Sequence, residues 1–198
     1  MKRRSTVLQR GSAPESPLPM THPNTPPHVN HHDFSHQGKR YTLGHLNGFD
    51  HTYTSVDPKT QVAAAYAVRV LFDDHCYTRG IPLGEPYDPE LFISQTVREV
   101  RVFDPQRYQL SLRLPALVKD LLNRQCYFGD QDNFVTIDLS TGEKYNVYFS
   151  LSKMGKRAGL RLRVQSAYLR DQQDKLQKVR FGLLLRNTQQ NIPTRPPR

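Results

Sequence analysis

The sequence predicts an α+β domain in which short helices pack on a four-stranded antiparallel meander, preceded by a disordered N-terminal arm. Four segments in the last third alternate as strands do, with short loops between them: residues 133–139, 144–152, 160–169 and 178–187. Residues 105–124 carry leucines at steps of three and four, the stripe of an amphipathic helix that could cover one sheet face. Residues 1–40 are rich in proline and polar side chains, a composition typical of disorder.

These patterns divide the chain into three parts. Residues 1–38 are expected to form the arm, residues 39–190 a single α+β domain, and residues 191–198 a disordered tail. The arm contains a cluster of histidines, a residue type that often binds metal ions. The cluster lacks the defined ligand spacing of a metal site, so we expect none there.

The first half of the domain is expected to alternate strands and loops before the helix. Residues 51–56, the second half of residues 62–72, and residues 97–103 alternate as strands. Asp104 and Pro105 then form a helix start, because aspartate caps a first turn and proline fits within it. Pro115 is expected to split the helix in two, since proline removes a backbone donor.

The strand at residues 160–169 organises the predicted sheet. Period-two alternation places Leu160, Leu162, Val164, Ser166 and Tyr168 on the buried face. The opposite face of the meander would be basic and partly aromatic. Its side chains would be Asn146, Tyr148, Ser150, Arg161, Arg163, Gln165, Arg180 and Arg186.

The charge distribution favours a polyanionic partner. The chain has a formal net charge of +10. Residues 144–198 hold thirteen basic and two acidic side chains, whereas residues 41–143 hold nine basic and fourteen acidic ones. A strongly positive block on strands is typical of nucleic-acid binding, with solubilising surface charge as the alternative explanation.

The predicted basic face suits RNA for chemical reasons. Guanidinium groups bind phosphate through paired hydrogen bonds, and a tyrosine ring stacks on bases. Cleavage also needs a base for the 2′-hydroxyl, an acid for the leaving group and positive charge near the phosphorus. The candidate nucleic-acid-binding residues are Tyr148, Arg161, Arg163, Arg180 and Arg186. The candidate catalytic residues are His75, Arg79, Arg163, Tyr168 and Arg170, with a structural role as a core tyrosine open for Tyr168. No cofactor motif and no metal-ligand spacing stands out.

Two helices followed by a four-stranded antiparallel sheet resemble the ribonuclease superfamily of barnase, EndoU, colicin-type nucleases and RelE toxins. The resemblance covers about residues 104–188, and its third strand, RLRVQSAYLRD, is similar to the RelE-like strand that ends in a His-Arg-Arg-Asp-type turn. The resemblance implies a metal-independent endoribonuclease of toxin type. The chain departs from the pattern at Tyr168, where a histidine is common. The first half (His45, HCYTRG and VREVRVFDPQRY) also resembles uncharacterised bacterial proteins of mobile elements.

Three functions therefore stay open. The first is an RNA-acting protein, and the second is a non-catalytic module that binds nucleic acid or an acidic protein such as an antitoxin or immunity protein. The third is a structural protein of a phage or plasmid. A cytoplasmic location is expected, because only two cysteines are present and neither a membrane span nor a secretion signal is apparent.

Overall fold

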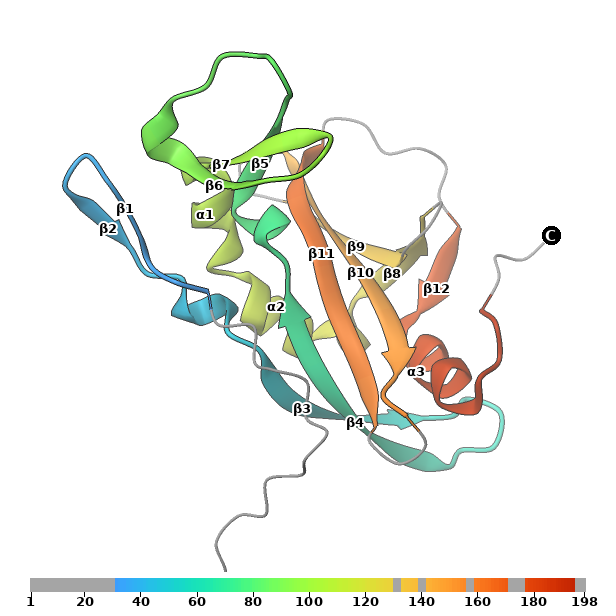
Figure 1. The fold of residues 1–198 in the computed structure, drawn as a ribbon. Helices are drawn as coiled ribbons and strands as arrows, with labels where there is room; N and C mark the ends of the chain where they lie inside the picture. The colour runs from blue at the N-terminus through green and yellow to red at the C-terminus, as the bar shows by residue number, and fades with distance from the viewer. Residues whose placement is uncertain (1–30, 130–132, 139–141, 156–158, 171–176, 195–198) are drawn as a thin grey trace, which may run out of the picture.

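A single seven-stranded sheet dominates the structure, a computed structural model that describes residues 31–129, 133–138, 142–155, 159–170 and 177–194 (Figure 1). Its strands lie in the order β12-β8-β9-β10-β11-β4-β3. Their bounds are β3 Phe49–Val56, β4 Ala63–Phe72, β8 Gln125–Phe128, β9 Asn133–Asp138, β10 Lys144–Lys153, β11 Leu160–Arg170 and β12 Lys178–Arg180. β11 and β4 pair in parallel, and the other neighbours pair antiparallel. The predicted four-stranded antiparallel meander is therefore wrong.

The error lies in the fourth predicted strand, not in the first three. β9, β10 and β11 do form a meander. Residues 178–187 instead contribute only the short strand β12, which pairs with β8, before helix α3 (Phe181–Gln190) begins. Phe181, Leu184 and Leu185 are buried, and their spacing of three and four residues is that of a helix. The same segment also alternates with the period of a strand, so both predictions fit its sequence. The free edge of β11 is occupied by β4 from the first half of the chain.

Two short helices follow Asp104, as the sequence predicts. The Asp104 carboxylate accepts hydrogen bonds from the first-turn backbone of α1 (Pro105–Ser111), and α2 (Leu114–Lys119) carries Pro115 in its own first turn. The chain then passes through a 3₁₀ turn, η4 (Leu121–Asn123), into β8.

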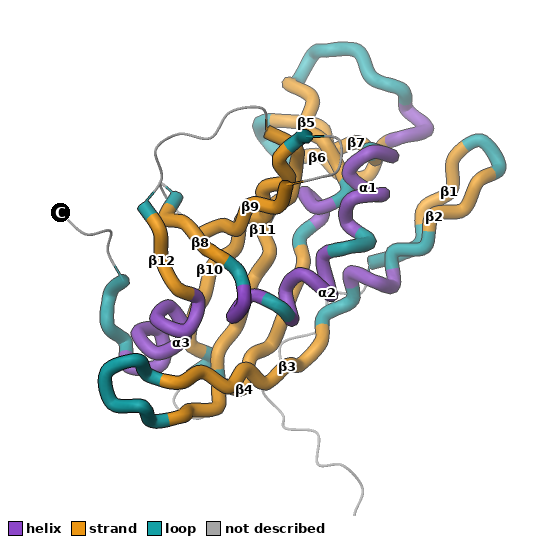
Figure 2. Tube along the Cα trace, turned by 180° about the vertical axis from the view of Figure 1, so that it is seen from behind, coloured by secondary structure: helices purple, strands orange, loops and turns teal. Residues whose placement is uncertain are grey.

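The core lies between the curled sheet and helices α2 and α3 (Figure 2). Tyr53 on β3 connects both helices, because its hydroxyl donates to Val118 O at 2.7 Å and its ring lies 5.0 Å from that of Phe181. Phe149 on β10 meets the same Phe181 ring at 5.8 Å. We call the face of β10 and β11 that is turned away from these helices the outer face.

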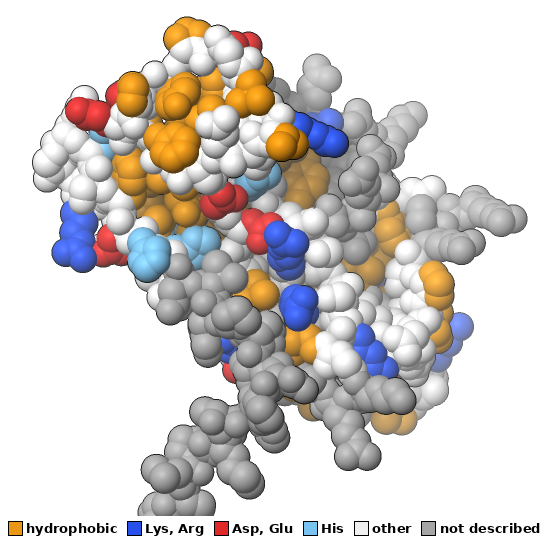
Figure 3. Space-filling model, viewed as in Figure 1, with side chains coloured by type: hydrophobic (Ala, Val, Ile, Leu, Met, Phe, Trp, Pro, Cys, Tyr) orange, Lys and Arg blue, Asp and Glu red, His pale blue; other side chains and the backbone are white. Residues whose placement is uncertain are grey.

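A separate three-stranded sheet forms the upper lobe in Figure 1. It contains β5 (Thr78–Pro82), β6 (Phe92–Gln95) and β7 (Glu99–Phe103) in the order β5-β7-β6, with η3 (Pro89–Leu91) before β6. Hydrophobic side chains gather on its surface (Figure 3), among them Leu83, Phe92 and Val97. The lobe joins the large sheet through η2 (Asp74–Cys76), directly after β4.

Part of the predicted arm packs on the domain. β1 (Phe34–His36) pairs with β2 (Lys39–Tyr41), and η1 (Gly44–Leu46) follows. The Phe34 ring stacks on Phe103 with centroids 4.4 Å apart. Residues 1–30 of the predicted arm and residues 195–198 of the predicted tail lie outside the described residues.

A β-bulge reverses the two faces of β11 halfway along the strand. Tyr148 pairs with Ser166, whereas the next residue, Phe149, pairs with Val164, so Gln165 is an extra residue. Beyond the bulge Ala167 is buried, and Ser166 and Tyr168 lie on the outer face. The prediction that Ser166 and Tyr168 share the buried face of Val164 is therefore wrong, because an inserted residue reverses the alternation.

Candidate functional site on the outer face of the sheet

Two stacked tyrosines lie at the centre of the candidate site. Tyr148 on β10 and Tyr168 on β11 have ring centroids 5.3 Å apart and ring planes 18° apart. They meet because the bulge turns Tyr168 onto the outer face, where Asn146 is its direct cross-strand partner. We call Tyr148 and Tyr168 the tyrosine pair.

Hydrogen-bond donors converge on the hydroxyl of Tyr148. Asn146 Nδ2 lies 3.3 Å from it, Arg170 Nη1 lies 3.4 Å from it, and the Tyr168 hydroxyl also donates to it. Partial burial alone would raise the pKa of Tyr148, but these hydrogen bonds bring that pKa below its ordinary value. The pKa of Tyr168 is raised to about 12, first by burial and then because Tyr168 donates its proton to Tyr148.

Neighbouring side chains hold this arrangement in place. Thr136 Oγ1 on β9 donates to Asn146 Oδ1 at 2.8 Å, so the amide nitrogen of Asn146 is directed to Tyr148. The Asn146 side chain is buried. Arg107 from α1 places its guanidinium 5.3 Å from the Tyr168 ring centroid. An amide thus contacts one tyrosine of the pair, and a cation lies over the other.

Arg107 also connects the tyrosine pair with η2. Its Nη1 donates to Thr78 O at 2.7 Å and to His75 O at 3.4 Å. Burial lowers the pKa of Arg107, although arginine keeps its proton at physiological pH. The Arg107 guanidinium therefore contacts both the segment that carries His75 and the ring of Tyr168.

Asp73, directly after the end of β4, binds the neighbouring part of β11. Asp73 N donates to Val164 O at 2.9 Å, and Arg163 Nε donates to Asp73 Oδ1 at 2.8 Å. His75 Nε2 lies 3.8 Å from Asp74 Oδ1, and its side chain is 45% exposed. Figure 3 shows acidic, basic and histidine side chains side by side at the junction between the lobe and the sheet.

His31 joins this junction from the segment predicted to be part of the arm. Its Nε2 donates to Phe72 O at 3.0 Å, and its Nδ1 lies 3.4 Å from the hydroxyl of Tyr77. Burial lowers the pKa of His31. The composition of the arm gave no sign of this contact, which depends on where β4 ends.

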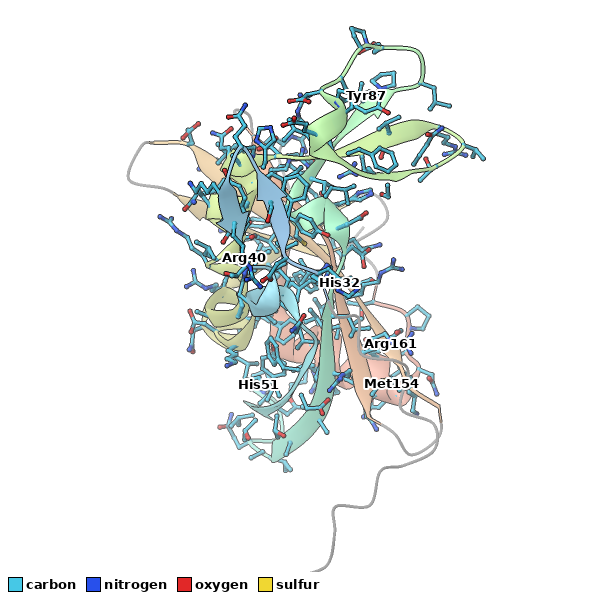
Figure 4. The ribbon with its side chains drawn as sticks, turned by 60° about the vertical axis from the view of Figure 1, so that its left-hand side comes forward. His32, Arg40, His51, Tyr87, Met154 and Arg161 are labelled. Carbon is cyan, nitrogen blue, oxygen red and sulfur yellow. The ribbon has the colours of Figure 1, made fainter. Side chains whose placement is uncertain are left out.

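The structure brings together part of the predicted site. Arg163, Tyr168 and Arg170 follow one another along the outer face of β11, with Tyr148 beside them and His75 connected through Arg107. Arg161 lies at the opposite end of β11, close to Met154 and far from the lobe that carries Tyr87 (Figure 4).

Three predicted residues lie elsewhere. Arg79 is exposed on β5 in the upper lobe. Arg180 is exposed on β12, and Arg186 lies on α3, where it forms an ion pair with Asp57. The predicted continuous arginine face fails here because residues 181–190 form a helix.

Sequence reasoning did not select Arg107, Asn146 or Asp73 as functional residues. The cap at Asp104 is the signal for Arg107, since a capped helix start fixes where the following residues point. Asp73 comes directly after β4. Its pairing with a residue 90 positions away has no local signal.

No metal centre is evident in the described parts of the chain. Within those ranges no three His, Cys, Asp or Glu side chains lie close enough together to hold a metal ion. Cys76 and Cys126 are buried free thiols, and burial raises the pKa of Cys126 to about 12. None of the described helices is long and apolar enough to cross a membrane.

The sequence profile of the YjaZ family matches residues 33–189. The chain belongs to the YjaZ family. The match covers the seven-stranded sheet, the upper lobe and nearly all of α3, so the tyrosine pair and the η2 junction both lie within the YjaZ domain. Comparisons with curated proteins and with solved structures gave no match. The resemblance to the ribonuclease-toxin superfamily therefore stays a prediction.

Proposed function

We propose that this YjaZ protein acts on RNA in the cytoplasm, as an endoribonuclease that needs no metal ion. The observation that carries the proposal is the outer face of β10 and β11. There two tyrosines, which can transfer protons, lie beside Arg170. Arg163 lies on the same face of β11, on the other side of the bulge. The positive charge of residues 144–198 supports a polyanionic substrate.

The proposed chemistry is attack of a 2′-hydroxyl on the adjacent phosphorus. A bond forms between the 2′-oxygen and phosphorus while the bond to the 5′-oxygen breaks, which yields a 2′,3′-cyclic phosphate and a free 5′-hydroxyl. Arg163 and Arg170 would stabilise the negative charge that gathers on the phosphate oxygens. His75 would give the 5′-oxygen its proton.

The test is cleavage of a single-stranded RNA in the presence of a chelator. We expect 2′,3′-cyclic phosphate ends, and no cleavage of the matching DNA because it lacks the nucleophile. His75→Ala should slow cleavage by about a hundredfold or more if the histidine is the general acid. Arg163→Ala should also slow it, whereas the control Arg124→Ala should not. Both arginines are in ion pairs of 2.8 Å with an aspartate, but the partner of Arg124 is Asp120 at the C-terminal end of α2.

A binding module for an acidic protein is the second candidate, and one observation favours it. Arg163 and Arg186 already bind carboxylates, those of Asp73 and Asp57, which is the contact an acidic partner would make. No RNA binding at all would contradict the ribonuclease and leave this candidate, whereas RNA binding without cleavage would indicate a non-catalytic nucleic-acid-binding module. Cleavage that requires magnesium would refute the proposed mechanism.

A further inference from the structure

The hydroxyl of Tyr148 lies among groups that stabilise a negative charge. An amide nitrogen, a guanidinium nitrogen and a second phenol all direct hydrogens toward its oxygen. Hydrogen bonds of this kind favour the ionised form of an acid, because they are stronger to an anion than to a neutral oxygen.

We infer that Tyr148 is the general base of the site, the group that accepts the proton of the 2′-hydroxyl. This assignment rests on the proposed function. The Tyr148 phenolate takes the proton as the bond between the 2′-oxygen and phosphorus forms, and His75 in its protonated form gives a proton to the departing 5′-oxygen. Tyr148 then loses its proton to water and His75 gains one, which restores the starting state.

The geometry separates Tyr148 from Tyr168. Tyr168 donates to Tyr148, so its own proton is engaged, and the Arg107 guanidinium lies over its ring. Tyr168 is thus a positioning residue, as is the buried Asn146. The same difference appears in the directions of their pKa shifts, downward for Tyr148 and upward for Tyr168.

The surrounding structure fits a group that changes charge during a reaction. Thr136 fixes the amide of Asn146 at 2.8 Å, so the donor is in place before the phenolate forms. The Tyr148 ring is half-buried. A base needs both properties: fixed donors that lower the cost of ionisation, and an approach for the substrate.

The experiment combines one substitution with two readouts. Tyr148→Phe keeps the ring and removes the hydroxyl, so RNA affinity should change by less than about twofold, whereas cleavage should fall by about a hundredfold or more. The second readout needs no RNA. The difference between the tyrosinate absorbance titrations of the native protein and Tyr148→Phe should show one phenol that ionises below pH 10, the ordinary tyrosine value.

Tyr168→Phe is the matched comparison, because it removes one donor and leaves the Tyr148 phenol present. We expect the pH–rate profile and the titration of Tyr148 to move together to higher pH, with activity recovered in alkali. If native protein cleaves RNA and Tyr148→Phe cleaves equally fast, only the role of Tyr148 is refuted. If native protein leaves RNA intact, the proposed function fails and this assignment with it. A difference titration at or above pH 10 would also overturn the assignment.

Discussion

Asp73→Asn should strengthen RNA binding by releasing Arg163. In the native protein Arg163 Nε donates to Asp73 Oδ1 at 2.8 Å, and the two side chains are 56% and 22% exposed. A phosphate that approaches Arg163 therefore competes with this carboxylate for the guanidinium. Because Arg163 is more than half exposed to solvent, loss of the pair should lower the free energy of unfolding by no more than about 1 kcal/mol.

The expected gain in affinity follows from a stronger contact between Arg163 and a phosphate, because the competing carboxylate is replaced by a neutral amide. Two unit charges 4 Å apart attract by about 1 kcal/mol in water, which corresponds to roughly fivefold in affinity. Each phosphate contact on a single strand adds about 0.7 to the slope of log affinity against log salt concentration. Asp73→Asn should raise the affinity and increase the slope by at most this amount, whereas Arg163→Ala should lower both.

The assay is fluorescence anisotropy of a labelled single-stranded RNA at several salt concentrations. Asp120→Asn is the control, because it makes the same change in net charge and releases Arg124 from a 2.8 Å ion pair at the end of α2. If both variants gain affinity equally, net charge alone explains the gain, and the outer face is not the RNA-binding surface. If Asp73→Asn gains nothing, Arg163 does not contact RNA.

Two further predictions concern stability. Tyr145→Phe should leave the protein equally stable or about 1 kcal/mol more stable at neutral pH, because the Tyr145 hydroxyl is buried and has no hydrogen-bond partner among the described residues. Burial raises the pKa of Tyr145 above the value of about 10 that it has in the unfolded chain. The phenol therefore ionises first in the unfolded chain, so stability is unaffected by this group below pH 10 and falls as the pH rises further. Chemical denaturation at pH 8 and above pH 10 should therefore show a smaller alkaline loss in Tyr145→Phe, and an unchanged loss would contradict this account. Gly159→Ala should lower the free energy of unfolding by about 1–3 kcal/mol, since Gly159 has φ +80° and a Cβ there would lie 2.6 Å from Ala67 O. Gly155→Ala has a similar φ of +70° with open space around the Cβ, so thermal melts should show a smaller loss for it, and equal losses would show that the contact with Ala67 does not matter.

Local patterns were sufficient for the parts of the fold that depend on neighbouring residues. The β10–β11 hairpin, the cap at Asp104 and the break at Pro115 all follow from short-range chemistry. The parallel contact between β11 and β4 could not be predicted, because nothing in either strand specifies a partner in the other half of the chain. The helical start at Phe181 was missed since FGLLLRN satisfies both periods.

The candidate site shows the same division. Tyr148 and Arg163 were identified because strand alternation alone places them on one face. Arg170 stands an odd number of positions from Arg163, so it shares that face only because of the bulge. Tyr168 was placed on the wrong face, since a one-residue bulge at Gln165 has no reliable sequence signal. The ion pair of Arg163 was also unpredictable, because the aspartate that binds it comes from a distant segment.

The parallel pairing of β4 with β11 has a consequence during synthesis. Val68 pairs with Leu160, which leaves the ribosome 92 residues later. At a translation rate of about 5–20 residues per second, β11 is synthesised about 5–20 seconds after β4. Through that interval Val68, Val70 and Phe72, all buried in the finished protein, lie along a strand edge with nothing to pair with. Slow translation or high expression should therefore favour aggregation through β4, and a chaperone that binds extended apolar segments should raise the yield of folded protein.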